Sequence, residues 1–130
     1  LFRSNGNPVN LAAGIATIQT LSAPGTFERM HAHGRALRAR IESAAATRGI
    51  DVVTTGSGPV FSVHFGLTEP PRDYRDTLPA SAELSAAFRL GLLERGVLVL
   101  PDGRWYVGAV HGDAELAIAL AAIDGAIAAL

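Results

Sequence analysis

The sequence predicts an α+β fold in which helices pack on one face of a small antiparallel sheet. Apolar residues recur with helical spacing over the first 48 residues, and from Ile50 onwards the pattern becomes β-branched and alternating. The segments with strand character arrive in hairpin-like pairs rather than singly between helices. This order favours an antiparallel sheet covered by helices over a doubly wound parallel one.

A first helix is predicted from Asn7-Pro8 to about Leu21. Asn caps the free N–H groups of a helix start, and Pro suits the first helical position. One face of this helix carries apolar residues stepping by three or four: Leu11, Ile15, Ile18 and Leu21. Residues 22–25, Ser-Ala-Pro-Gly, end it.

A second helix is predicted to begin with Thr26 as its cap, run to about Arg48 and stop at Gly49. Its inward face comprises Met30, Gly34, Leu37, Ile41 and Ala44, and its outward face Arg35, Arg38 and Glu42. Gly in an exposed helix costs about 1 kcal/mol relative to Ala. We therefore expect Gly34 to let another element approach closely.

A pair of strands is predicted at residues 51–55 and 60–65, with a turn between them. Phe61, Val63 and Phe65 share one face of the second strand, whereas Ser62 and His64 face a wetter surface or a cleft. The turn, residues 55–59, resembles a phosphate-binding loop only in its glycines. A phosphate cradle is followed by a helix, and here a strand follows.

The remaining elements are a loop, a helix, a hairpin and a final helix. Residues 67–80 lack any period and are predicted to form a functional or mobile loop. Ser81 is expected to cap a helix closed by Gly96 and carrying Leu84, Phe88 and Leu92. Around the turn Pro101-Asp102-Gly103, residues 97–100 and 105–110 are predicted to pair as a hairpin. Asp113 is expected to cap the last helix, with a stripe of Leu116, Leu120, Ile123, Ile127 and Leu130.

Composition excludes several classes of function. The net charge is −1, so nothing attracts this surface to nucleic acid or to an anionic membrane, and no apolar run reaches membrane-spanning length. The chain has no Cys, which fits a reducing, cytoplasmic setting. All eleven basic residues are Arg, so no Lys can form a Schiff base. The first residue is Leu rather than Met, and we expect a cut end within a longer chain.

Catalytic and metal-binding residues are not predicted. His31 and His33 are two apart on a helix and point in different directions, so these two are expected to be solvated or capping residues rather than metal ligands. The chain has no Gly-x-Ser-x-Gly elbow, and no Ser or Thr has local support as a nucleophile.

Two candidate binding sites remain. Arg104 begins the predicted strand and can hold a carboxylate with both nitrogens, and His111 lies at the end of that strand, so both are candidate substrate-binding residues. Asn5, Gly6 and Asn7 place backbone N–H groups at a helix start, where a cofactor phosphate is favoured. The plainer alternatives are a solvated Arg, a hydrogen-bonded His and an ordinary capped helix.

Four short motifs occur in the order known from one family. Gly6-Asn7-Pro8 with the Ala-Ala-Gly helix start at residues 12–14 resembles the start of a helix in class III aminotransferases, in the branch of glutamate-1-semialdehyde aminomutase. Residues 56–61, residues 92–97 and the stretch from Pro101 to His111 are similar to three further segments of that branch. The resemblance covers nearly the whole chain.

The resemblance implies a C-terminal small domain of a fold-type I pyridoxal phosphate enzyme. Residues 1–25 would be a helix bridging to a large domain, and residues 26–130 the small α+β domain. In that family the large domain holds most of the pyridoxal phosphate, including the Lys that attaches it, and the enzyme is a homodimer acting on an amine or amino acid. This segment would shape the substrate mouth and the subunit interface.

Departures from the family pattern limit what the resemblance implies. The family has a Thr just before its Gly-Asn-Pro, and here residues 3–5 are Arg-Ser-Asn. The stretch from Pro101 to His111 is shorter than in the aminomutases, with Gly108 and Gly112 where Ser and Thr are expected. Substrate choice therefore does not carry over. The alternative function is a freestanding, non-catalytic α+β module for interaction or small-ligand binding.

Overall fold

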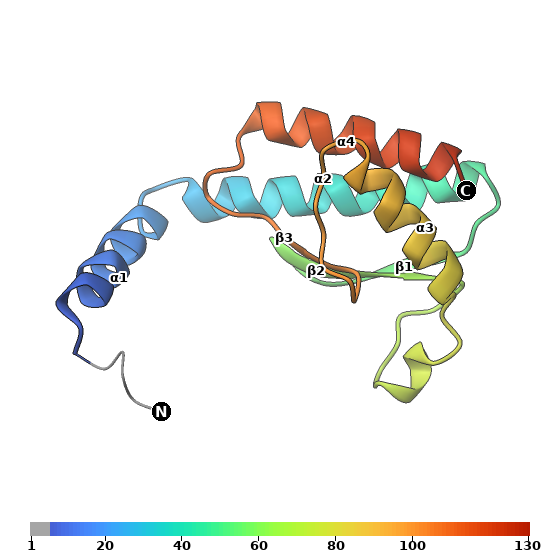
Figure 1. Ribbon diagram of the computed structural model, residues 1–130, viewed down its shortest axis with the longest axis horizontal. Coiled ribbons are helices and arrows are strands. Elements are labelled where there is room, and N and C mark those ends of the chain that lie inside the picture. Colours follow the sequence, from blue (N-terminus) through green and yellow to red (C-terminus); the bar gives the residue numbers. More distant parts are fainter. Residues whose placement is uncertain (1–5) are drawn as a thin grey trace.

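The computed structural model describes residues 6–130 and shows the α+β fold that the sequence predicts (Figure 1). The elements are α1 (Pro8–Leu21), α2 (Thr26–Thr47), β1 (Val52–Ser57), β2 (Val60–Phe65), the short 3-10 helix η1 (Arg75–Thr77), α3 (Ala82–Leu93), β3 (Arg104–Tyr106) and α4 (Asp113–Ala128). The sheet is antiparallel with strand order β1-β2-β3. Helices α2, α3 and α4 lie on one side of it.

The core lies between the sheet and these three helices. Phe61, Val63 and Phe65 of β2 are buried on the helix side, as the alternation predicts. The ring of Phe61 stacks on Trp105 of β3 at 5.4 Å between centroids, and Phe65 meets Phe88 of α3 edge-on at 5.0 Å. On the helix side these rings meet the stripes of α2 and α4, including Leu37, Ile41, Ile123 and Ile127.

Helix α2 is fixed to the edge of the sheet by polar side chains that were expected to face outward. Arg38 donates to the hydroxyl and carbonyl of Thr54 and to the carbonyl of Gly56, and Glu42 accepts from the Thr54 hydroxyl. The outward assignment is therefore wrong for Arg38, which is half-buried, whereas Glu42 is exposed as expected although it reaches Thr54. Helical periodicity separates apolar from polar positions, but it does not show that a long side chain reaches over to a neighbouring strand.

Gly34 is the point where α2 meets the turn between β1 and β2. A Cβ atom at this position would overlap the carbonyl oxygen of Gly58 and approach its carbonyl carbon at 2.7 Å. The expected role of Gly34, close approach of another element, is confirmed.

Two predicted helix caps are confirmed and two are wrong. Asn7 accepts from the Val9 N–H at 2.9 Å, and Ser81 accepts from the Leu84 N–H at 3.2 Å. Thr26 and Asp113 are instead the first helical residues, after Gly25 and Gly112 at the cap positions. The Thr26 hydroxyl donates to the Thr20 carbonyl instead, and the Asp113 carboxylate contacts His33.

The predicted hairpin of residues 97–100 and 105–110 does not form as a strand pair. β3 is only three residues long and pairs with β2, with Trp105 opposite Phe61. Of the expected ladder, a single bond remains, from the Leu100 N–H to the Arg104 carbonyl at 3.3 Å. Val97 is held by the end of α3, where its N–H donates to the Leu92 carbonyl at 2.9 Å, and this directs the following residues away from β3.

Helix α1 projects from the rest of the chain (Figure 1). Its predicted apolar face is exposed at Leu11, Ile15 and Ile18, and only Leu21 is half-buried. The domain boundary near residue 25 stays a prediction; the main contact of α1 within the described residues is with α2. None of the helices within residues 6–130 is both long and apolar enough to cross a membrane.

Candidate functional site

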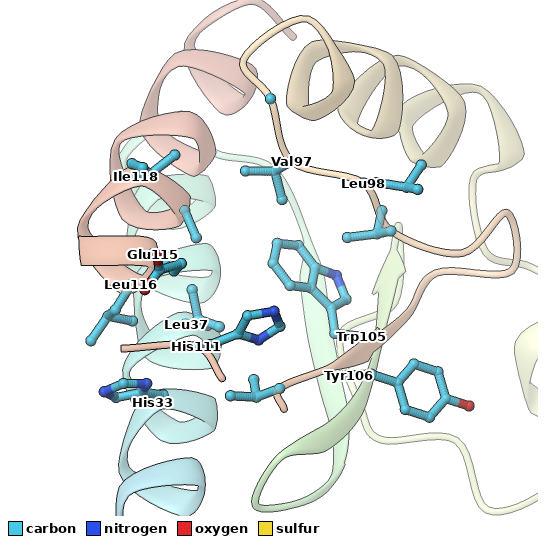
Figure 2. Close-up of a pocket in the computed structure, with 14 residues that line it drawn as sticks. His33, Leu37, Val97, Leu98, Trp105, Tyr106, His111, Glu115, Leu116 and Ile118 are labelled. Atoms are coloured by element: carbon cyan, nitrogen blue, oxygen red, sulfur yellow. The ribbon is translucent and has the colours of Figure 1, made fainter. Parts of the chain in front are cut away.

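A pocket of about 260 Å³ opens between helices α2 and α4, strand β3 and the segment that follows α3 (Figure 2). Residues 96–99 form one wall, β3 and Val107 form another, and the start of α4 closes it against α2. Most of its lining is apolar. Its polar side chains are His33, His111 and Glu115, whereas the side chain of Tyr106 points away from it (Figure 2).

His111 is the predicted site residue that the structure places in this pocket (Figure 2). It lies in the connection between β3 and α4, where its N–H donates to the Gly108 carbonyl in a tight turn. The Gly108 N–H donates back to His111 Nδ1 at 3.0 Å. Since Nδ1 accepts, the neutral ring carries its proton on Nε2 and offers a donor there. Its role in substrate binding stays a prediction.

His33 is buried rather than solvated, contrary to expectation. It is 5% exposed, and its Nε2 lies 3.3 Å from a carboxylate oxygen of Asp113 in the first turn of α4. The contact joins α2 to α4 beside the pocket. No group of metal-ligating side chains assembles within residues 6–130.

Glu115 places a carboxylate in the pocket lining at the start of α4. It accepts from the Gly112 N–H at 2.8 Å, closing the first turn of the helix. This hydrogen bond, with a further backbone bond and the nearby His111, holds the pKa of Glu115 below its usual range. The carboxylate therefore stays charged into the acid range.

Arg104, the second predicted substrate-binding residue, is not among the residues lining this pocket. It lies opposite Ser62 on the sheet face that the helices leave open, and its guanidinium contacts the Asp102 carboxylate at 2.7 and 2.6 Å. This contact lowers the pKa of Asp102 and raises that of Arg104. The structure does not bring Arg104 and His111 together, and substrate binding by Arg104 stays a prediction.

The open sheet face also carries His64. Its Nε2 is 3.0 Å from the Thr55 hydroxyl, and partial burial lowers the pKa of His64. The turn residue Asp102 lies near the end of the 67–80 loop, where both line a shallow hollow with His64. Arg104 and the loop thus share one side of the molecule, and His111 lies on another.

The predicted phosphate contact falls partly outside the described residues. Asn5 lies outside them, and Gly6 is exposed with φ 78°. The Asn7 side chain is occupied with the Val9 N–H, and Pro8 has no N–H to offer. Binding of a cofactor phosphate by Asn5, Gly6 and Asn7 stays a prediction.

Sequence reasoning missed the aromatic and aliphatic part of the pocket. Trp105 forms its floor and is 5% exposed, while Leu98 and Ile118 stand at its rim (Figure 2). The available signal was the apolar run of residues 97–100, which was assigned to a hairpin strand instead.

Comparisons with known proteins relate the chain to one group of enzymes. It is 31% identical to glutamate-1-semialdehyde 2,1-aminomutase of Nitrosospira multiformis over 92% of the chain, and 36% identical to that of Verminephrobacter eiseniae over 91%. It superposes on an omega-transaminase from Sphaerobacter thermophilus with TM-score 0.81 and 26% identity over 95% of the chain. A solved transaminase with PLP bound gives TM-score 0.77 and 25% identity over 94% of the chain.

The chain spans only a part of these proteins. It covers 28% and 27% of the two aminomutases and 28% and 27% of the two transaminases. A scan against protein-family models finds no match. By sequence and by fold, the chain resembles the C-terminal segment of class III pyridoxal-phosphate-dependent aminotransferases, in the branch of glutamate-1-semialdehyde aminomutase.

Proposed function

We propose that the chain is the C-terminal small domain of a pyridoxal-phosphate-dependent aminotransferase or aminomutase, and that it does not catalyse the reaction alone. The observation that carries the proposal is the similarity to such enzymes over more than nine tenths of the chain, in both sequence and fold. The pocket, the open sheet face and the exposed apolar face of α1 are then surfaces available to meet the rest of the enzyme.

Pyridoxal phosphate would be held mainly by polypeptide outside this chain. The cofactor is attached through a Lys, and the sequence contains none. When bound, it supplies an electron sink for bonds at the amine-bearing carbon. The residues of this chain then bind and orient: Gly6 and Asn7 lie at the predicted phosphate contact, and His111 offers an Nε2–H donor in an apolar pocket.

The substrate is proposed to be a small amine or amino acid. Arg104 supports a carboxylate-bearing substrate, because its guanidinium already holds the Asp102 carboxylate with two nitrogens. A substrate carboxylate would have to compete with Asp102. The pair is exposed, so exchange of one carboxylate for another costs little.

The test uses the longer protein that contains this sequence. After purification it should be yellow, with the visible absorption band of a lysine-bound cofactor, and lose that band on borohydride treatment and on replacement of the attaching Lys. The 130-residue chain alone should remain colourless under the same conditions. A gene that encodes only these 130 residues, or a longer protein that binds no pyridoxal phosphate, would instead favour the freestanding module.

A further inference from the structure

Residues 97–100 run between two apolar grooves, with Leu98 and Leu100 exposed and Val97 and Val99 half-buried. One is the pocket described above, and the other, of about 330 Å³, lies between the same segment and α3, lined by Leu90, Leu93, Leu98 and Leu100 among others. Leu98, which is 82% exposed, lines both. The two grooves therefore form one continuous apolar surface, of the kind that marks an interaction site.

The backbone of this segment lacks partners. Across residues 6–130, no hydrogen bond reaches the N–H groups of Leu98 and Val99 or the carbonyls of residues 97–99. The N–H of Val97 is used by the end of α3, and that of Leu100 by Arg104. Val-Leu-Val-Leu is a sequence with strong strand character and no strand beside it.

The facing edge of β3 is open as well. The Val63 N–H donates to the Gly103 carbonyl before β3, and the Val107 N–H donates to the Pro59 carbonyl after it. Because hydrogen bonding alternates along an antiparallel pair, the backbone groups of Tyr106 point to the other edge, towards the pocket and away from β2. Two unpaired edges thus border the same apolar groove (Figure 2).

We infer that an extended apolar segment of the longer polypeptide, outside these 130 residues, adds to this edge as a strand and fills the groove. Backbone pairing with an exposed edge supplies affinity, and alternate side chains of the added strand enter the pocket. The groove suits apolar side chains, because its one carboxylate, Glu115, is bonded to the Gly112 N–H at the start of α4.

The same polypeptide is the occupant that the observations favour. The chain covers 28% of its aminomutase relative, so most of such a protein lies outside it, and this inference rests on the proposed function in that respect. A bare edge next to a large apolar surface is prone to aggregation. A segment of the same polypeptide covers the edge permanently and so prevents aggregation at every concentration. A transient partner would leave the edge exposed for part of the time.

Cysteine labelling of the longer protein tests the inference, since this chain has no Cys of its own. Leu98→Cys should react with a thiol reagent at least about tenfold more slowly in the native protein than in denaturant. Ala46→Cys, on the exposed side of α2, is the matched control and should react at nearly the same rate in both. Mass spectrometry of the labelled peptides assigns each rate to its position.

Hydrogen exchange supplies the backbone readout. The amides of Leu98, Val99 and Tyr106 should exchange slowly in the longer protein, whatever its concentration. Rapid labelling of Leu98→Cys with rapid exchange of these amides overturns the inference. Protection that disappears on dilution assigns the groove to a second copy and overturns it too.

The outcome separates from that of the proposed function. If the longer protein shows the cofactor absorbance but Leu98 is unprotected, the added strand is contradicted and the enzyme assignment is retained. If Leu98 is protected but the protein binds no pyridoxal phosphate, the enzyme assignment is contradicted and the added strand is retained.

Discussion

Single residues determine how closely the elements of this chain approach. Gly34 on α2 and Gly58 in the β1–β2 turn meet backbone to backbone, and a Cβ atom on Gly58 would in turn overlap the ring of His31. Neither side can move without shifting a helix or a strand. The turn is thereby fixed against α2, and with it the position of β2 and of β3 next to it.

Replacement of Gly34 by Ala should destabilise the fold. The added methyl group meets a carbonyl group rather than a flexible side chain, so the free energy of unfolding should fall by about 1–3 kcal/mol, or roughly 4 °C of Tm per kcal/mol. Thermal unfolding followed by circular dichroism measures it. Gly14→Ala is the control, because it lies in α1 with open space around it and should not lower Tm. Equal Tm values for Gly34→Ala and wild type would contradict the close packing.

The Asp102–Arg104 pair yields a prediction about substrate affinity. Asp102→Asn should leave Tm almost unchanged, because exposed ion pairs stabilise little. In the longer enzyme it should lower the KM for carboxylate-bearing substrates by freeing Arg104, whereas Arg104→Gln should raise it. Steady-state kinetics with an amine that lacks a carboxylate is the control, and neither change should affect its KM. The same shifts with both substrates would argue against Arg104 as the anchor.

Individual elements differ in how well local sequence defines them. The strand β2 could be predicted from its alternation, and α3 from Ser81 and the Phe88 and Leu92 stripe, because each signal lies within the element. The position of residues 97–100 could not be predicted in this way. Their strand character is real, but the end of α3 directs them away from β3, and that is a tertiary effect that no window of sequence contains.

The candidate site was predictable only in part for the same reason. His111 could be selected from its place at a strand end, whereas Trp105 and Ile118 join it only because α4 folds back over β3. His33 was expected in solvent, since a polar residue on a helix gives no sign that an acidic residue 80 positions later will bond to it.

The start of α4 should make stability depend on pH. The pKa of Glu115 is held low by the Gly112 N–H, so its charged form stabilises the folded state above the ordinary pKa of Glu, and this is lost as pH falls through the lowered value. Glu115→Gln should therefore lower Tm at neutral pH, with the difference from wild type shrinking in acid. Glu83→Gln, in the first turn of α3, accepts no hydrogen bond in residues 6–130 and is the control. A difference that stays constant with pH would contradict this role.

Within residues 6–130, helices α2 to α4 and the sheet share one core, whereas α1 has no buried residue. Leu11, Ile15 and Ile18 are each more than half exposed, although they form the apolar face that a helix normally buries. Exposing such an apolar face to water is unfavourable in free energy, and exposed apolar faces of this kind are typical of interaction sites. In the proposed enzyme it is placed to meet the large domain or the second subunit.

Charging that face should therefore leave the shared core intact and disrupt assembly. Ile15→Glu should change the free energy of unfolding of the 130-residue chain by no more than about 0.5 kcal/mol, as substitutions at exposed sites generally do. In the longer protein, the same change should shift a homodimer towards monomer, measured by light scattering across a dilution series, because a buried carboxylate without a partner opposes association. Ala13→Glu, exposed on the side of α1 opposite Ile15, is the control and should leave the dimer intact. A stable Ile15→Glu dimer would remove α1 from the subunit interface and leave the large domain as its only remaining contact in the proposed enzyme.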